Sequence, residues 1–171
     1  MEIRKTTPDD LPAVMDIFSG ARRYMAAHGN PHQWVNRPTE DDVRHDMAGG
    51  HSYVCTEGDR IVGTFAYLPG PDPTYRTVYG GSWPDDEPYG VIHRIAGTPG
   101  HRGVFDAALR WAFAHCSRLR IDTHADNLIM QRLLLDRGFC HCGTILLKDG
   151  SPRLAYFCLL YTSDAADDGE S

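Results

Sequence analysis

The stretch VIHRIAGTPGHRGVFDAALRWAFAH, residues 91–115, decides how this chain folds. Residues 91–96 are mainly β-branched or apolar, and the GTPG sequence at 97–100 follows them, which indicates a buried strand ended by a turn. After the turn, apolar residues recur at steps of three and four, so we expect a helix with one buried face. Gly103 begins this helix behind Arg102, where unpaired N–H groups and the helix dipole favour an anion. The first turn of the helix is therefore a predicted phosphate site.

The next segment repeats the order of strand and helix. Residues 119–123 indicate a second strand, and Ala125–Asn127 supplies turn residues after it. A second amphipathic helix, with leucines at 133–135, continues to Gly138, which can adopt the left-handed conformation that ends a helix. Residues 89–139 are thus predicted to form strand, helix, strand and helix in that order.

Four short motifs in this region resemble the acyl-CoA-binding core of the GNAT superfamily of N-acyltransferases: Ile95–Gly97, Arg102–Val104, Asp126–Asn127 and Arg137–Phe139. The resemblance extends over about residues 1–157, which we expect to form a single domain. It implies an α/β (α+β) fold with a mixed, mainly antiparallel sheet of about six or seven strands flanked by helices. Strands 91–96 and 119–123 should run parallel, joined by a right-handed crossover, and splay apart.

The resemblance also implies acetyl-CoA as acyl donor. Attack of an amine on a thioester requires an anion site, a hydrogen-bond donor for the acyl oxygen and a route for the proton. We expect Arg102 and the N–H groups of residues 103–106 to hold the pyrophosphate, the backbone of residues 95–97 to pair with the pantetheine arm, and Asn127 to contact that arm. The expected donor-binding residues are Ile95, Ala96, Gly97, Arg102, Gly103, Val104, Phe105, Asp106 and Asn127.

The chain departs from the family pattern at two positions. Phe105 stands where the phosphate loop usually has a small residue, so its side chain either turns into the core or weakens donor binding. Leu134 replaces the tyrosine that often protonates the departing thiolate. Because a CoA thiolate is a reasonable leaving group, losing this acid should slow the reaction less than losing the base would. Tyr156 is a candidate substitute.

His93 is the candidate general base, with Asp122 on the neighbouring strand as its orienting partner. Histidine has an ordinary pKa near neutral pH, which suits it to accept a proton from an amine. The alternative is a strand histidine that is simply hydrogen-bonded in place. His124 is a second candidate, and Arg94 is expected to be structural, in a salt bridge or packed along its stem.

Candidate acceptor residues lie in two irregular segments. Trp34 follows the first predicted helix and is either a wall of the acceptor pocket or an aromatic cap on the core. Residues 69–88 are rich in Pro, Gly and Asp, and long loops of this kind often carry function. In this segment Tyr79, Trp83 and Glu87 could select the amine. The alternative is a surface insertion that its aromatic residues hold against the domain.

Composition limits the remaining classes of function. The chain has 171 residues, 42% of them hydrophobic, and a net charge of −6, which argues against nucleic acid as a partner. No apolar run precedes the charged residues 2–5, so we expect no signal peptide and no membrane span. Five cysteines without framework spacing indicate reduced thiols and a cytoplasmic protein, either a monomer or a homodimer. Cys140–Cys142 lacks the usual zinc spacing, so no metal site is expected.

Three functions remain open from the sequence. The first is N-acetyl transfer from acetyl-CoA to a primary amine of a small molecule by direct attack. The second is acetylation of a protein N-terminus or lysine, which requires an open groove. The third is a non-catalytic acyl-CoA-binding domain. The departures from the family pattern at residues 105 and 134 are the reason to consider it.

The C-terminal residues 158–171 differ in character from the rest of the chain. CLLYTSDAAD at 158–167 resembles one reading frame of a transposase sequencing adapter. We therefore expect residues 158–171 to be a non-native tail and, being acidic and poor in apolar residues from 164 onward, disordered.

Overall fold

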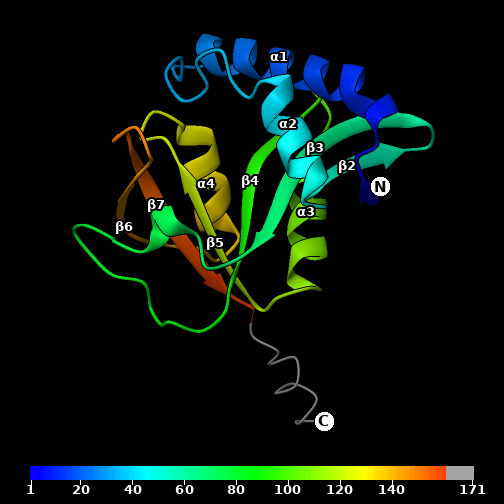
Figure 1. Ribbon diagram of the computed structural model, residues 1–171. Helices are drawn as coiled ribbons and strands as arrows, with labels where there is room; N and C mark the ends of the chain where they lie inside the picture. The colour runs from blue at the N-terminus through cyan, green and yellow to red at the C-terminus, as the bar shows by residue number, and fades with distance from the viewer. Residues whose placement is uncertain (161–171) are drawn as a thin grey trace.

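A computed structural model describes residues 1–160 of the chain. A seven-stranded sheet in the order β1-β2-β3-β4-β5-β7-β6 crosses the molecule, with helices packed against it (Figure 1). Its strands are β1 (Glu2–Lys5), β2 (Ser52–Glu57), β3 (Arg60–Pro69), β4 (Gly90–Gly97), β5 (Arg118–Thr123), β6 (Cys140–Leu146) and β7 (Pro152–Leu159). The helices are α1 (Leu11–Ala27), α2 (Glu40–Ala48), α3 (Val104–Phe113) and α4 (Leu128–Asp136), with short 3-10 turns η1 (Pro8–Asp10) and η2 (Pro73–Tyr75). The expected mixed, mainly antiparallel sheet is confirmed.

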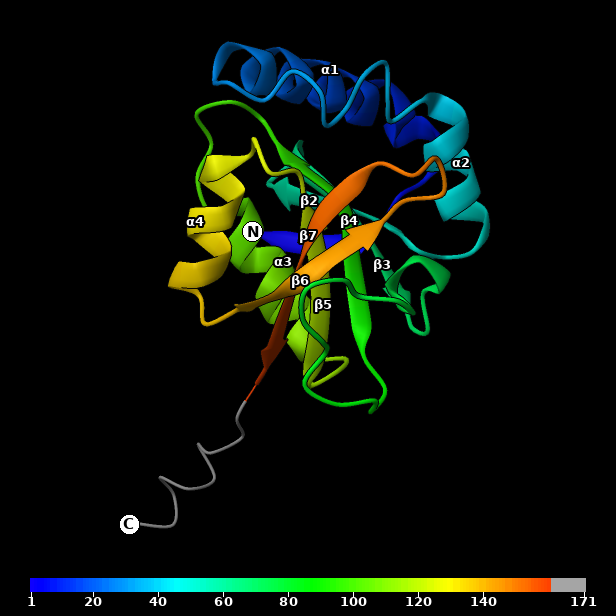
Figure 2. The ribbon, with the colours of Figure 1, turned by 90° about the vertical axis from the view of Figure 1, so that its left-hand side faces the viewer.

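Both faces of the sheet are covered. Successive residues of a strand point to opposite faces, and on β2 Val54 packs in a cluster with α1 whereas Cys55 packs in the main core with α3. Figures 1 and 2 show α1 lying across one end of the sheet and α4 beside β5. Among the helices of residues 1–160, none has the length and apolar character to cross a membrane.

Helix α3 approaches the sheet closely because two glycines face it. A Cβ on Gly63 would lie 2.6 Å from a methyl group of Val104, and one on Gly97 would lie 3.1 Å from the other. Val104 is the first residue of α3, so these contacts fix the start of the helix against β3 and β4. The predicted phosphate site is thereby placed at the end of β4.

Strands β4 and β5 are parallel and splay apart, as predicted. Their pairing is limited to Gly90 with Leu119 and Val91 with Arg120. Beyond this point β4 also changes register against β3 between Thr64 and Ala66, where an extra residue stands on β4. Arg94 adopts a left-handed backbone, with φ of 51°, at this irregularity. The edge of β4 that faces β5 is therefore open from residue 92 onward within the part of the chain that the structure describes.

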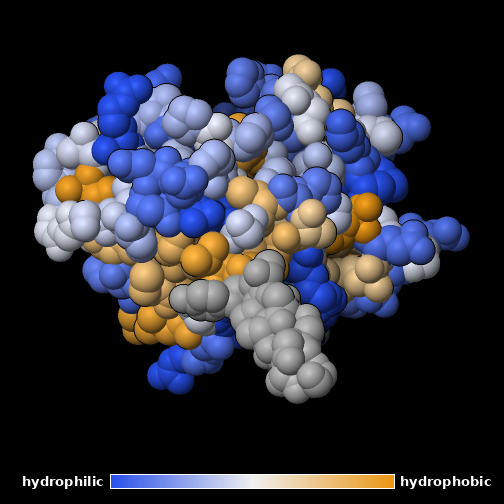
Figure 3. Space-filling view, turned by 90° about the horizontal axis from the view of Figure 1, so that it is seen from below, coloured by the Kyte–Doolittle hydropathy of each residue, from blue (hydrophilic) through white to orange (hydrophobic). Residues whose placement is uncertain are grey.

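Strand β7 continues past residue 157, the predicted end of the domain. Cys158 pairs with Leu119 and Leu159 with Arg118, and the Leu160 N–H donates to the Ser117 carbonyl at 2.8 Å. Cys158 also packs against the main core. Residues 158–160 thus extend β7, whereas the expected disorder concerns residues outside the described range. Apolar side chains gather at this end of the domain (Figure 3).

Candidate active site

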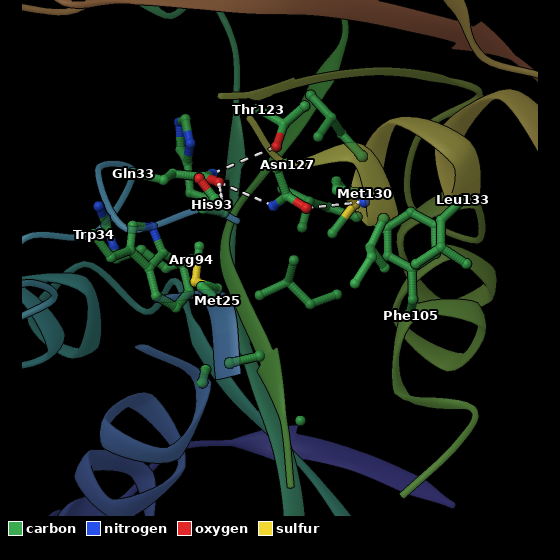
Figure 4. Close-up of a pocket in the computed structure, with 18 of the residues that line it drawn as sticks. Met25, Gln33, Trp34, His93, Arg94, Phe105, Thr123, Asn127, Met130 and Leu133 are labelled. Atoms are coloured by element: carbon green, nitrogen blue, oxygen red, sulfur yellow. Dashed lines mark hydrogen bonds between the residues drawn. The ribbon is translucent and has the colours of Figure 1, made fainter. Parts of the chain in front are cut away.

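A cavity of about 1210 Å³ opens where β4 and β5 separate. Its walls come from β4, the start of α3, the end of β5, α4 and the segment between α1 and α2. Figure 4 shows Phe105, Met130 and Leu133 on one side of it and Gln33, Trp34 and His93 on the other. We call the side near residues 95–106 the donor half and the side around His93 the acceptor half.

The donor half contains the predicted phosphate site at the first turn of α3. Gly103 has a φ of 97°, and the first helical hydrogen bond runs from the Ala107 N–H to the Gly103 carbonyl. The N–H groups of residues 104–106 precede that bond, which leaves them available to an anion. Arg102 and Gly103 are exposed and line the cavity, so an anion can reach this turn from solvent.

Phe105 and Asp106 explain how the unusual phosphate loop is accommodated. Phe105 is half-buried against the main core, and the Arg137 guanidinium lies 5.8 Å from the centre of its ring. Asp106 forms a two-bond ion pair with Arg137, which lowers the pKa of Asp106. Arg137 therefore offsets the negative charge of Asp106 next to the phosphate site. Of the two alternatives for Phe105, this packing favours a side chain turned toward the core, although the residue also lines the cavity.

The end of β4 supplies the other predicted donor contacts. Ile95, Ala96 and Gly97 line the cavity on the open edge of the strand, where backbone groups are free to pair with an extended ligand. Arg94 donates through Nε and Nη2 to the carboxylate of Asp46 at 2.8 and 2.7 Å. Asp46 is 4% exposed, so this pair anchors α2 to β4. The structural role expected for Arg94 is confirmed.

His93 lies between two carboxylates in the acceptor half. Its Nε2 is 3.1 Å from Oδ2 of Asp72, and its Nδ1 is 4.0 Å from Oδ2 of Asp122. The hydroxyl of the buried Tyr75 donates to Asp122 at 2.7 Å. Asp72 is thus the carboxylate within hydrogen-bond distance of the His93 ring, and the orienting role of Asp122, which lies farther away, stays a prediction.

Asp72 stays ionised because several hydrogen-bond donors surround its carboxylate. Burial alone would raise its pKa, but hydrogen bonds from His93 and from the side chain and backbone of Thr74 lower the pKa to about 2. Burial and the neighbouring Asp122 raise the pKa of Tyr75 well above its usual value. A neutral phenol and a charged carboxylate therefore flank the histidine at neutral pH.

His124, the second candidate base, does not line the cavity. Its Nδ1 accepts a hydrogen bond from the Asp126 N–H at 3.0 Å, so it closes the turn that precedes α4. Burial, together with the charge of Arg153, lowers the pKa of His124. This histidine is part of the local turn structure.

Trp34 and Gln33 form the wall of the acceptor half that lies opposite α4. Trp34 lines the cavity and also meets Phe18 of α1 edge-on at 5.5 Å, so it packs on the core, and its contact with an acceptor stays a prediction. Oε1 of Gln33 accepts from the Asn127 side chain at 2.9 Å, and its Nε2 lies 3.5 Å from the Thr123 hydroxyl (Figure 4). Asn127 also caps α4 through the Met130 N–H. Asn127 thus has a structural role in this network, and its contact with the pantetheine arm stays a prediction.

The predicted acceptor residues of the 69–88 segment lie elsewhere. Tyr79, Trp83 and Glu87 do not line the cavity. Trp83 stacks on the Arg120 guanidinium at 4.1 Å, and its indole N–H donates to the Tyr75 carbonyl. Tyr79 pairs with Thr144 of β6. Their selection of the acceptor stays a prediction that the position of the cavity does not favour; the Trp83 side chain and the backbone of Tyr79 hold the segment against β5 and β6.

Sequence reasoning missed Asp72, Gln33 and Arg153. Asp72 carried a readable signal, since an Asp before Pro73 and Thr74 commonly caps a short helical turn, as it does here at η2. Leu134 is fully buried, and Tyr156 is buried against His141 outside the cavity, so neither position supplies an acid there. Within residues 1–160 no group of three or more metal-ligating side chains is assembled.

Comparison with known proteins agrees with this geometry. The model of the acetyltransferase (GNAT) family matches residues 11–139. No curated protein sequence matches the chain significantly. A GNAT-family acetyltransferase from Streptococcus agalactiae is similar in structure, with a TM-score of 0.79 and 28% identity over 92% of this chain and 94% of that one.

Two further solved structures share the fold. An acetyltransferase from Staphylococcus aureus has a TM-score of 0.68 and 23% identity over 94% and 100% of the two chains. A chain of the NatC complex bound to Gag peptide and CoA has a TM-score of 0.53 and 14% identity, again over 94% and 100%. Since the family model covers most of the chain, this protein belongs to the acetyltransferase (GNAT) family and is an acyl-CoA-dependent acetyltransferase.

Proposed function

We propose that this enzyme transfers an acetyl group from acetyl-CoA to a primary amine of a small molecule by direct attack. The observation that carries the proposal is the position of His93: it lines the same cavity as the phosphate site, and its ring is fixed by an ionised carboxylate. A base and an acyl-donor site that share one cavity are what a single-step transfer requires.

Donor binding follows from the chain's own groups. Arg102 and the N–H groups of residues 103–106 suit a pyrophosphate, and the open edge of residues 95–97 suits an extended amide-containing arm. Acetyl-CoA has both parts. The similarity to a NatC chain solved with CoA supports this choice of donor.

The acceptor reaction assigns a proton route to His93. If Nε2 carries the proton that it shares with Asp72, Nδ1 keeps a lone pair that faces Asp122. The amine nitrogen attacks the thioester carbonyl, His93 takes the proton that the nitrogen loses, and the C–S bond breaks to release the CoA thiolate. No tyrosine is needed at position 134, because the thiolate can leave unprotonated and be protonated by solvent.

The shape of the acceptor half favours a small molecule over a protein chain. Gln33 connects the segment between α1 and α2 to Asn127 and Thr123, and the Gln33 carbonyl accepts from Arg153 at 3.3 Å. This segment therefore lies across the acceptor half, where a protein substrate would require an open groove. The free state of all five cysteines fits a reducing, cytoplasmic location. A monomer or a homodimer is proposed.

The test is His93→Ala, measured against an amine panel with acetyl-CoA. We expect turnover to fall about 100- to 10,000-fold, the usual contribution of a general base. Affinity for acetyl-CoA, measured by calorimetry, should stay within about twofold, because His93 acts on the acceptor. The control is His141→Ala, at a histidine of β6 whose ring lies tilted against Tyr156 outside the cavity. Unchanged turnover in His93→Ala would refute the assignment of the base.

A further inference from the structure

Arg153 of β7 is a buried guanidinium in the wall of the acceptor half. It is 8% exposed and lines the cavity. Its hydrogen bonds go to two backbone carbonyls, from Nη1 to Pro152 at 2.8 Å and from Nη2 to Gln33 at 3.3 Å. No carboxylate oxygen of residues 1–160 forms a salt bridge with it. The charge of the guanidinium is therefore not offset by a carboxylate, and further N–H groups remain for another partner.

Most of the other arginines of residues 1–160 that are not fully exposed have partners that offset their charge; the exception is the half-buried Arg22, which donates to the Arg37 and Pro38 carbonyls and to the Ser19 hydroxyl. Four form ion pairs with aspartates: Arg4 with Asp10, Arg94 with Asp46, Arg118 with Asp85 and Arg137 with Asp106. Arg120 is sandwiched between the rings of Trp83 and Tyr89 at 4.1 and 3.8 Å. Burial of a charge without such a partner is costly, so the position of Arg153 indicates a ligand that completes it.

Two titratable neighbours of Arg153, Asp149 and His124, do not offset its charge. The carboxylate of Asp149 accepts hydrogen bonds from the Ser151 side chain and N–H, which lower the pKa of Asp149 more than the charge of Arg153 does. Asp149 is exposed, and its carboxylate oxygens lie more than 4.0 Å from the guanidinium nitrogens of Arg153. His124, on the other side, is disfavoured as a cation by burial and by Arg153 itself.

The register of the sheet places Arg153 on the same face as Asp122. Asp122 pairs with Ala155, and residues two apart on a strand share a face, so Arg153 and Asp122 are diagonal neighbours. Such neighbours have Cα atoms about 7–8 Å apart. A small molecule can therefore place an amine beside His93 and Asp122 and reach Arg153 with its other end.

We propose that the acceptor amine carries an anionic group, a carboxylate or a phosphate, that binds Arg153 while the amine lies at His93. Amino acids are the simplest class with both groups. The inference rests on the proposed function and names the substrate class of the same site. The planar guanidinium favours oxyanions that accept two N–H bonds together.

The experiment compares kcat/KM within matched pairs of amines. The pairs are α-amino acids with their amides, ω-amino acids of increasing length with the alkylamines that lack the carboxylate, and phosphoethanolamine with ethanolamine. Wild type should prefer the anionic member of at least one pair by about 10- to 100-fold, and Arg153→Met should reduce this preference by a similar factor. Arg153→Lys should keep part of it. Arg76→Met removes an exposed arginine outside the cavity and should keep all of it.

Several results would overturn the inference while leaving the proposed function intact. These are a wild-type preference for the neutral members, or an anion preference that Arg153→Met leaves unchanged. If wild type acetylates no amine of either kind, the proposed function fails instead. Ligand-detected NMR with N-acetylglycine and N-methylacetamide in the presence of CoA then still tests the site. Equal binding of both probes, or N-acetylglycine binding that survives in Arg153→Met, would refute it.

Discussion

The donor and acceptor halves of the cavity differ in how they are built. The donor half comes from one continuous segment, residues 95–106, and uses backbone groups at the end of β4 and the start of α3. The acceptor half combines side chains from separate parts of the chain: Gln33, Asp72, His93, Asp122 and Arg153. A site made of backbone in one segment can be inferred from local sequence, whereas a site made of distant side chains depends on how the whole chain folds.

The strongest test of the donor half is Gly103→Val. The φ of 97° is strained for valine, and the side chain would stand where phosphate must approach the N–H groups. We expect acetyl-CoA affinity to fall about 100-fold or more, measured by calorimetry. Gly58→Val is the matched control, because Gly58 also has a positive φ, of 60°, and open space around its Cβ position in the β2–β3 turn. An equal loss in both variants would trace the effect to general strain.

The corresponding test of the acceptor half is Asp72→Asn. Loss of the charge that orients His93 should lower kcat about 10- to 100-fold and leave acetyl-CoA affinity unchanged. Asp122→Asn should have the smaller effect on kcat. The opposite ranking would restore Asp122 as the orienting partner.

The lowered pKa of Asp72 also predicts that the free energy of unfolding depends on pH. The pKa of Asp72 in the folded protein is about 2, below its ordinary value of 3.8, so its charged form stabilises the fold above pH 3.8. This contribution, about 2 kcal/mol at most, is lost as the pH falls from 3.8 toward 2. Denaturant titrations should therefore show wild type more stable than Asp72→Asn at pH 6 and a shrinking difference below pH 4. A difference that persists at pH 2 would contradict the assigned pKa.

The fold could be predicted because its signals are local and periodic. The strand at residues 91–96, the glycine turn after it and the apolar stripe of α3 each limit the backbone by themselves, and the resemblance of the motifs fixed their arrangement. The differences between the predicted site and the observed cavity have another origin. Tyr79 and Trp83 were assigned by residue type, but whether an aromatic faces a ligand or another side chain depends on packing, which here brings Trp83 onto Arg120. The hydrogen-bond partner of His93 is Asp72, a loop residue 21 positions earlier in the chain, so the pattern of the strand could not indicate it.

Trp83→Ala separates a structural from a substrate-binding role for the 69–88 segment. Removal of the ring should lower the free energy of unfolding by about 1–3 kcal/mol, because Trp83 covers Arg120 and packs on the buried Tyr75. The KM values for amine and acetyl-CoA should stay within about twofold. Tyr79→Ala, at an exposed side chain of the same segment, should change stability by less than about 0.5 kcal/mol. A raised KM for the amine with stability intact would reinstate Trp83 as an acceptor residue.

The smallest expected effect concerns the end of β7, where sequence and structure disagree on a boundary. Chains that end at residue 157 and at residue 160 differ by Cys158, Leu159 and Leu160, which pair with β5 and its preceding turn. Loss of these hydrogen bonds and of the Cys158 packing should lower the free energy of unfolding by about 1–2 kcal/mol in chemical denaturation. Both chains should bind acetyl-CoA equally, because β5 separates from β4 at the opposite end of this pairing. Equal stability of the two chains would show that the adapter-like residues add nothing to the sheet and would return the domain boundary to residue 157.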